Sequence, residues 1–130
     1  QGATVLDIGS GAGLPGIVIA LARPDLKVTL LEPLQRRVNF LEEATVGLGI
    51  EVHRGKAEQE RGQYDYVTAR AVAPLSKLWA ISKHLIKPGG SLLAMKGEAA
   101  QAEAAEIPGA IVHEITLEDI PLARVVEVKR

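Results

Sequence analysis

A glycine-rich loop that follows a short apolar run restricts the fold of this chain more than any other feature. Ala3–Ile8 has the composition of a buried strand, residues 7–16 read DIGSGAGLPG, and a periodic apolar segment follows over Leu14–Leu21. Closely spaced glycines let the main chain turn sharply and let a ligand approach a helix N-terminus without meeting a Cβ atom. Glycines can also serve only to make a tight turn, but this spacing directly after a strand favours a ligand-binding loop.

The rest of the chain alternates between short apolar runs and longer amphipathic segments, which is typical of a doubly wound α/β fold. We expect further strands at residues 27–31, 50–53, 64–68 and 91–95, and helices at residues 34–48, 74–86 and 98–106. Val38, Leu41 and Leu48 are expected on one face of the second helix. The triplet Pro88-Gly89-Gly90 is expected to end the third.

The last two apolar runs, Ile111–Leu117 and Leu122–Val128, are too close together for a helical crossover between parallel strands. We therefore expect them to pair antiparallel. The prediction is a doubly wound, mostly parallel sheet that ends in a C-terminal antiparallel hairpin, within one domain over residues 1–130.

Composition excludes several kinds of site. The chain has 15 Lys plus Arg against 16 Asp plus Glu, a formal net charge of −1, so any contact with RNA must use a local patch. It has no cysteine, and its three histidines lack metal-ligand spacing, so we expect no metal. The longest apolar stretch, Gly13–Ala22, contains Pro15 and is too short to span a bilayer, so we expect no membrane partner.

The loop contains Gly11-x-Gly13-x-x-Gly16, which matches the dinucleotide-binding fingerprint. In a dinucleotide site, however, the first glycine of the fingerprint lies at the strand end, whereas here the first glycine after the strand is Gly9. The strand-end acid Asp7 suits a ligand that carries ammonium and sulfonium charges better than it suits a pyrophosphate. The sequence therefore favours S-adenosylmethionine over NAD.

Two further acids follow strands of the predicted sheet. Glu32 comes at the end of the second strand, where its carboxylate can accept hydrogen bonds from both ribose hydroxyls of a nucleoside. Its alternative role is that of an exposed acid at a helix N-terminus, before Pro33. Glu58, after the third strand, is placed to reach an adenine, although alone it would be an ordinary loop acid.

Several motifs occur together in a specific order. They are DIGSGAGLPGI at residues 7–17, RRV with FL at 36–41, GKAE at 55–58, TARAVA at 68–73 and AMKG at 94–97. In this combination the chain resembles the bacterial small-subunit ribosomal RNA guanine-N7 methyltransferases, the RsmG family, formerly called glucose-inhibited division protein B. The resemblance covers essentially the whole chain.

This resemblance implies a Rossmann-like class I methyltransferase fold, S-adenosylmethionine as cofactor, and methyl transfer to N7 of a guanine in 16S ribosomal RNA or the small ribosomal subunit, in the cytoplasm. The family has a helical segment before the first strand that this chain lacks, so we expect the chain to be a fragment. The alternatives are a methyltransferase that acts on a small molecule or a protein, and a cofactor-binding fragment without activity.

The resemblance also implies individual roles. The positions that match the family's cofactor contacts are Gly9, Leu14, Ala57, Glu58 and Arg70, and the general fold adds Asp7, Gly11 and Glu32. Arg70 and Lys96 are expected to orient the substrate, since a guanidinium or ammonium can contact phosphate or a guanine edge. The alternatives are a solvated arginine at a strand end and an ordinary surface lysine.

Overall fold

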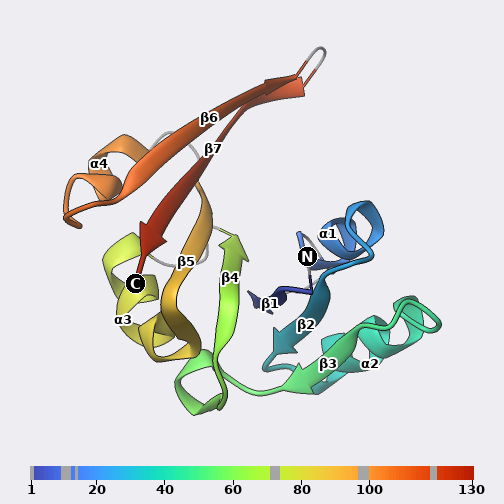
Figure 1. Cartoon of the computed structure of the whole chain (residues 1–130). Helices are drawn as coiled ribbons and strands as arrows, with labels where there is room; N and C mark the ends of the chain where they lie inside the picture. The colour runs from blue at the N-terminus through green and yellow to red at the C-terminus, as the bar shows by residue number, and fades with distance from the viewer. Residues whose placement is uncertain (1, 10–12, 14, 71–73, 97–99, 118–119) are drawn as a thin grey trace.

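The structure, a computed structural model, is built on one seven-stranded sheet with the order β3-β2-β1-β4-β5-β7-β6 (Figure 1). It describes residues 2–9, 13, 15–70, 74–96, 100–117 and 120–130, and within residues 115–123 it describes the main chain only. Two of the predicted cofactor contacts, Gly11 and Leu14, lie outside the described residues.

The strands are β1 Thr4–Ile8, β2 Lys27–Glu32, β3 Glu51–Arg54, β4 Tyr64–Arg70, β5 Ile86–Lys96, β6 Ile111–Leu117 and β7 Ile120–Lys129. Strands β1 to β5 pair in parallel. Strand β7 pairs antiparallel with both β5 and β6. The predicted mostly parallel sheet with a C-terminal antiparallel hairpin is therefore confirmed.

Helices cover both faces of the sheet. They are α1 Gly16–Ala22, α2 Gln35–Ala44, α3 Leu75–Ser82 and α4 Ala100–Ala104, with 3₁₀ turns η1 Ala57–Gln59 and η2 Lys83–Leu85. Helices α1 and α2 lie on one side and α3 and α4 on the other (Figure 1). Val5 and Leu6, consecutive on β1, enter the two separate cores. A sheet buried on both faces explains why its strands read as continuous apolar runs.

The second helix is shorter than predicted. Helix α2 ends at Ala44, and although Val38 and Leu41 are buried as expected, Leu48 is 40% exposed. The hydroxyl of Thr45 donates to the carbonyl of Leu41, and the next main-chain bonds join residues three apart. The chain therefore tightens into turns after Thr45 and carries Leu48 off the helical face.

The third helix also ends early, because part of its predicted range belongs to the sheet. Helix α3 stops at Ser82, and β5 begins at Ile86, which is fully buried and pairs with Tyr64. The triplet that was expected to stop a helix lies inside β5, where the register shifts between Tyr64 and Tyr66. A Cβ atom at Gly90 would lie 2.5 Å from the carbonyl oxygen of Asp65, so this irregular pairing requires a glycine.

In the part of the chain that the structure describes, every helix is too short or too polar to cross a bilayer.

Candidate functional site

The five parallel strands end at one edge of the sheet, and the chain reverses direction there. From the central strand β1 the sequence proceeds outward through β2 and β3, then returns to place β4 and β5 on the other side of β1. Ligands of doubly wound sheets bind outside this kind of reversal, at the carboxyl ends of the strands. Gly9, Glu32 and Arg70 follow or end β1, β2 and β4, three adjacent strands, so the fold brings these predicted site residues together.

The buried carboxylate of Asp7 fixes the start of α1 to the sheet. Its side chain is fully buried, one carboxylate oxygen accepts the amide of Gly16 at 3.1 Å, and the other accepts the hydroxyl of Thr68 at 2.8 Å. The carboxylate thus links β1 to the first residue of α1 and to β4. Its contact with a ligand's ammonium group stays a prediction, whereas its structural role follows directly from these bonds.

The first residue of α1, Gly16, packs so closely against the sheet that a side chain would not fit there. A Cβ atom at Gly16 would lie 2.3 Å from Cδ2 of Leu30 and 2.8 Å from Oδ2 of Asp7. At the other end of the loop, Gly9 has a φ of +64° and donates its amide to the carbonyl of Leu31 at 2.8 Å. Both ends of the loop are therefore fixed to β1 and β2, beside the carboxyl edge.

Glu32 is buried where β2 meets the start of α2. Its side chain is 1% exposed, Oε2 accepts the amide of Leu34 at 2.9 Å, and Oε1 lies 4.0 Å from Nη1 of Arg37. The alternative interpretation was an exposed acid at a helix N-terminus. Glu32 does bond to the main chain at the start of α2, but its side chain is buried. Contact with ribose hydroxyls stays a prediction.

The link between β3 and β4 carries two predicted cofactor contacts, Ala57 and Glu58, of which Glu58 is expected to reach an adenine. Ala57 begins η1 and is buried in the core on the α3 side of the sheet, whereas Glu58 is exposed. Ala57 can therefore offer its main chain to a ligand while its methyl group packs inward. The roles of both residues stay predictions.

Arg70 and Lys96 have very different surroundings. Arg70 is exposed at the end of β4, paired in register with Met95. The Lys96 side chain is only 4% exposed, and its Nζ lies 3.1 Å from Oε1 of Glu103 on α4. Lys96 is therefore not the ordinary surface lysine of the alternative interpretation. Its ammonium group would have to leave this ion pair to contact RNA.

Glu103 and Thr68 are the residues that sequence reasoning missed. Oε1 of Glu103 also accepts the amide of Leu75 at the start of α3. Burial alone would raise the pKa of Glu103, but the bonds from Leu75 and Lys96 outweigh it and leave this pKa below its ordinary value. Thr68 bonds to Asp7 and Glu103 bonds to Leu75, partners that are distant in sequence, so no local pattern marks these two residues.

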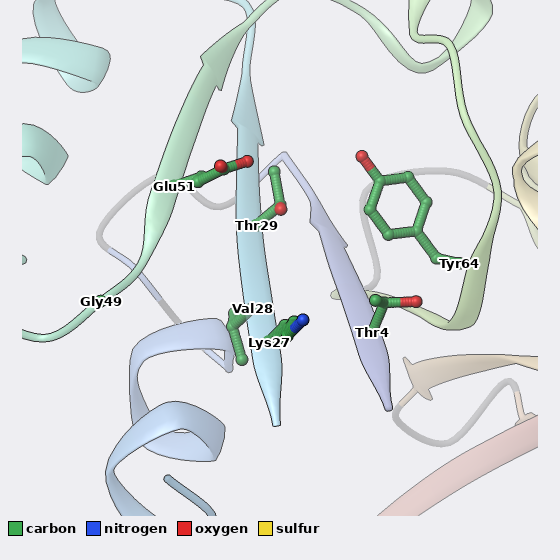
Figure 2. A pocket seen from close by; sticks show the side chains of 7 residues that line it. All are labelled: Thr4, Lys27, Val28, Thr29, Gly49, Glu51 and Tyr64. Carbon is green, nitrogen blue, oxygen red and sulfur yellow. The ribbon is translucent and has the colours of Figure 1, made fainter. Parts of the chain in front are cut away.

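One pocket among the described residues lies away from the carboxyl edge of the sheet. A hollow of about 410 Å³ lies where β1, β2 and β4 begin, and none of the predicted site residues lines it (Figure 2). The described residues hold no group of three or more His, Asp or Glu side chains placed to bind a metal ion.

Solved structures share this fold at low sequence identity. A predicted O-methyltransferase from Agrobacterium tumefaciens has a TM-score of 0.78 and 19% identity, covering 99% of this chain and 74% of that protein. The PKMT2 protein from Rickettsia typhi, solved in complex with AdoHcy, has a TM-score of 0.63 and 16% identity, covering 80% of this chain and 23% of that protein. These likenesses establish the Rossmann-like methyltransferase fold.

Sequence comparison is more specific. A protein from Thermobifida fusca named ribosomal RNA small subunit methyltransferase G is 56% identical over 111 residues, which are 82% of this chain and 47% of that protein. Its namesake from Corynebacterium jeikeium is 49% identical over 138 residues, covering 98% of this chain and 62% of that protein. The chain thus spans about half the length of the curated relatives that it matches. The family model GidB, rRNA small subunit methyltransferase G, matches residues 1–125. The chain therefore belongs to the rRNA small subunit methyltransferase G family.

Proposed function

We propose that residues 1–130 form the methyltransferase domain of a longer protein, and that this domain transfers a methyl group from S-adenosylmethionine to N7 of a guanine in 16S ribosomal RNA, in the cytoplasm. The observation that carries the proposal is the buried Asp7 carboxylate, which links β1 to the start of α1 and to β4 at the carboxyl edge of the sheet, in a chain whose sequence matches this family. The small ribosomal subunit or its RNA is the proposed partner.

The residues at the carboxyl edge fit this cofactor. The tight packing at Gly16 brings the N-terminus of α1 close to the sheet, Glu32 supplies a carboxylate for ribose hydroxyls, and Ala57 with Glu58 would border the adenine. Gly9, Gly11, Leu14 and Arg70 would complete the cradle. The Rickettsia typhi protein of the same fold holds AdoHcy, which supports the assignment. When bound, S-adenosylmethionine supplies an electrophilic methyl group on a positively charged sulfur.

The chain's own contribution is positioning rather than proton transfer. Guanine N7 has a lone pair that is free at neutral pH, so the proposed reaction needs no general base. Correct orientation of two reactants can supply roughly 7–11 kcal/mol of a barrier. The exposed guanidinium of Arg70 can donate to guanine O6, to a phosphate or to the cofactor carboxylate. Lys96 would join it only after leaving Glu103.

Calorimetric titration with S-adenosylhomocysteine tests the cofactor assignment, with NAD as the control ligand. We expect binding of S-adenosylhomocysteine alone, and binding of NAD alone would overturn the proposal. Mass spectrometry of 16S ribosomal RNA after incubation with S-adenosylmethionine then tests the substrate. A methyltransferase for small molecules or proteins would bind the cofactor but leave the RNA unmodified, and so would a binding fragment without activity.

Replacing Arg70 with alanine should lower kcat/KM for ribosomal RNA by roughly 10- to 100-fold, the loss expected for one or two charge-assisted hydrogen bonds. Arg61→Ala is the matched control, because Arg61 is also exposed but lies before β4, away from the carboxyl edge. Methylation rates and cofactor affinity should be measured for both variants. An Arg70→Ala protein as active as the control would show that this guanidinium has no role in transfer.

A further inference from the structure

The link between β3 and β4, residues 55–63, contains little regular secondary structure. It passes from the edge strand β3 across to β4 with only the three-residue turn η1, and Ala57 is its one buried residue. Short 3₁₀ turns have weak hydrogen-bond geometry of their own. Because this link carries the predicted cofactor contacts Ala57 and Glu58, its position matters for the proposed cofactor site.

One carboxylate in the link, that of Glu60, contacts both strands that flank it. Oε2 of Glu60 accepts the hydroxyl of Tyr64, the first residue of β4, at 3.1 Å, and it lies 2.8 Å from Nδ1 of His53 on β3. The Glu60 side chain is only 12% exposed. A partly buried carboxylate with two donors in range forms stronger hydrogen bonds than a solvated one.

The main chain of Glu60 continues the same connection into η1. Its amide donates to the carbonyl of Lys56 at 3.1 Å, which closes the turn that contains Ala57 and Glu58. On the far side, Nε2 of His84 lies 3.3 Å from the carbonyl oxygen of Glu60. Displacement of Glu60 would therefore shift η1 directly.

The hydroxyl of Tyr64 keeps its proton and therefore remains a hydrogen-bond donor. Burial disfavours the phenolate, and the charge and hydrogen bond of Glu60 add to this effect, so the pKa of Tyr64 is raised to about 12. Figure 2 shows the Tyr64 side chain directed toward the side of the sheet where Thr29 and Glu51 lie. Glu51 also places Oε2 3.4 Å from Nε2 of His53, which limits the ring's freedom.

We propose that Glu60 is a positioning residue for cofactor binding: its bonds to Tyr64 and His53 hold η1 so that Ala57 and Glu58 remain at the carboxyl edge of the sheet. This inference rests on the proposed function, because it assumes a cofactor whose adenine meets η1. Glu60 itself does not contact the cofactor.

Titration of single variants with S-adenosylhomocysteine tests the proposal. Glu60→Ala and Tyr64→Phe should each raise the dissociation constant about tenfold, the effect of one lost hydrogen bond to a charged group. Glu60→Gln keeps an oxygen that can accept the Tyr64 hydroxyl, and it should restore most of the affinity. Gln63→Ala, at an exposed position of the same link, is the control and should bind as the unmodified protein does.

Steady-state kinetics separates positioning from a general loss of structure. In Glu60→Ala and Tyr64→Phe the KM for S-adenosylmethionine should rise while the KM for ribosomal RNA stays unchanged. A purely structural defect would instead lower the thermal midpoint and disturb both constants. If Glu60→Ala does not fold, the milder Tyr64→Phe variant decides the question.

The two tyrosines of the chain allow a spectroscopic check. In a Tyr66→Phe background, the ultraviolet absorbance of tyrosinate reports Tyr64 alone. Glu60→Gln should lower the pKa of Tyr64 from about 12, yet leave it above the ordinary value because burial is the largest cause of the shift. An unchanged pKa would show that Glu60 does not engage this hydroxyl in solution.

The outcomes distinguish the two proposals. If the unmodified protein does not bind S-adenosylhomocysteine, the proposed function fails and the role of Glu60 fails with it. If the unmodified protein binds but Glu60→Ala and Tyr64→Phe bind equally well, only the positioning role is overturned. A rise confined to the KM for RNA would overturn it too.

Discussion

Glu103→Ala should lower the free energy of unfolding by about 3 kcal/mol, because it leaves the Lys96 ammonium group buried without this carboxylate and removes the acceptor of the Leu75 amide. Chemical denaturation at neutral pH measures the loss. Glu106→Ala is the matched control, since this acid is exposed just beyond α4, and it should change stability by less than about 0.5 kcal/mol.

The pH dependence of this variant follows from the pKa of Glu103. That pKa is depressed in the folded protein, so the carboxylate stabilises the fold above its unfolded pKa and the contribution disappears as pH falls through the folded value. The difference in free energy of unfolding between the unmodified protein and Glu103→Ala should therefore be largest at neutral pH and become smaller in acid. A difference that grows in acid would contradict this account.

Removing both charges tests whether loss of the Lys96–Glu103 ion pair is the cause. The double variant Lys96→Met with Glu103→Leu should recover much of the lost stability, since apolar replacement of a buried ion pair is often nearly neutral. If the double variant is as unstable as Glu103→Ala, the cost lies instead in the Leu75 amide and the start of α3.

The elements of the fold were predictable because the signals for them are local. The apolar run before Gly9 and the short spacing of the last two runs each describe a neighbouring stretch of chain, and the structure confirms both the strand and the hairpin. The errors at Leu48 and Ile86 have a different origin. Helix α2 ends where the Thr45 hydroxyl donates to the Leu41 carbonyl, a local bond that apolar periodicity does not reveal, whereas Ile86 joins the sheet because it pairs with the distant residue Tyr64.

The candidate site was predictable only in outline. Alternation of strands and helices implies parallel strands whose carboxyl ends share one edge, and the observed strand order makes Gly9, Glu32 and Arg70 neighbours at that edge. The sequence pattern does not predict which residue pairs with each buried charge. Asp7 meets Thr68 only because β1 and β4 pair in that register, and Lys96 at the end of β5 meets Glu103 only because α4 packs against α3, β6 and β7. Such pairings depend on tertiary packing rather than on sequence pattern.

Gly16→Ala should destabilise the protein by about 2 kcal/mol and greatly weaken binding of S-adenosylhomocysteine, because the new methyl group would overlap Leu30 and the Asp7 carboxylate and push α1 away from the sheet. Leu30→Val removes the closer of these two atoms, Cδ2, so it should partly rescue the alanine variant. The double variant should then be more stable than the sum of the two single effects predicts, which is the sign of direct contact. Strictly additive effects, or cofactor affinity unchanged in Gly16→Ala, would show that close packing of α1 on β1 and β2 does not shape the proposed cofactor site.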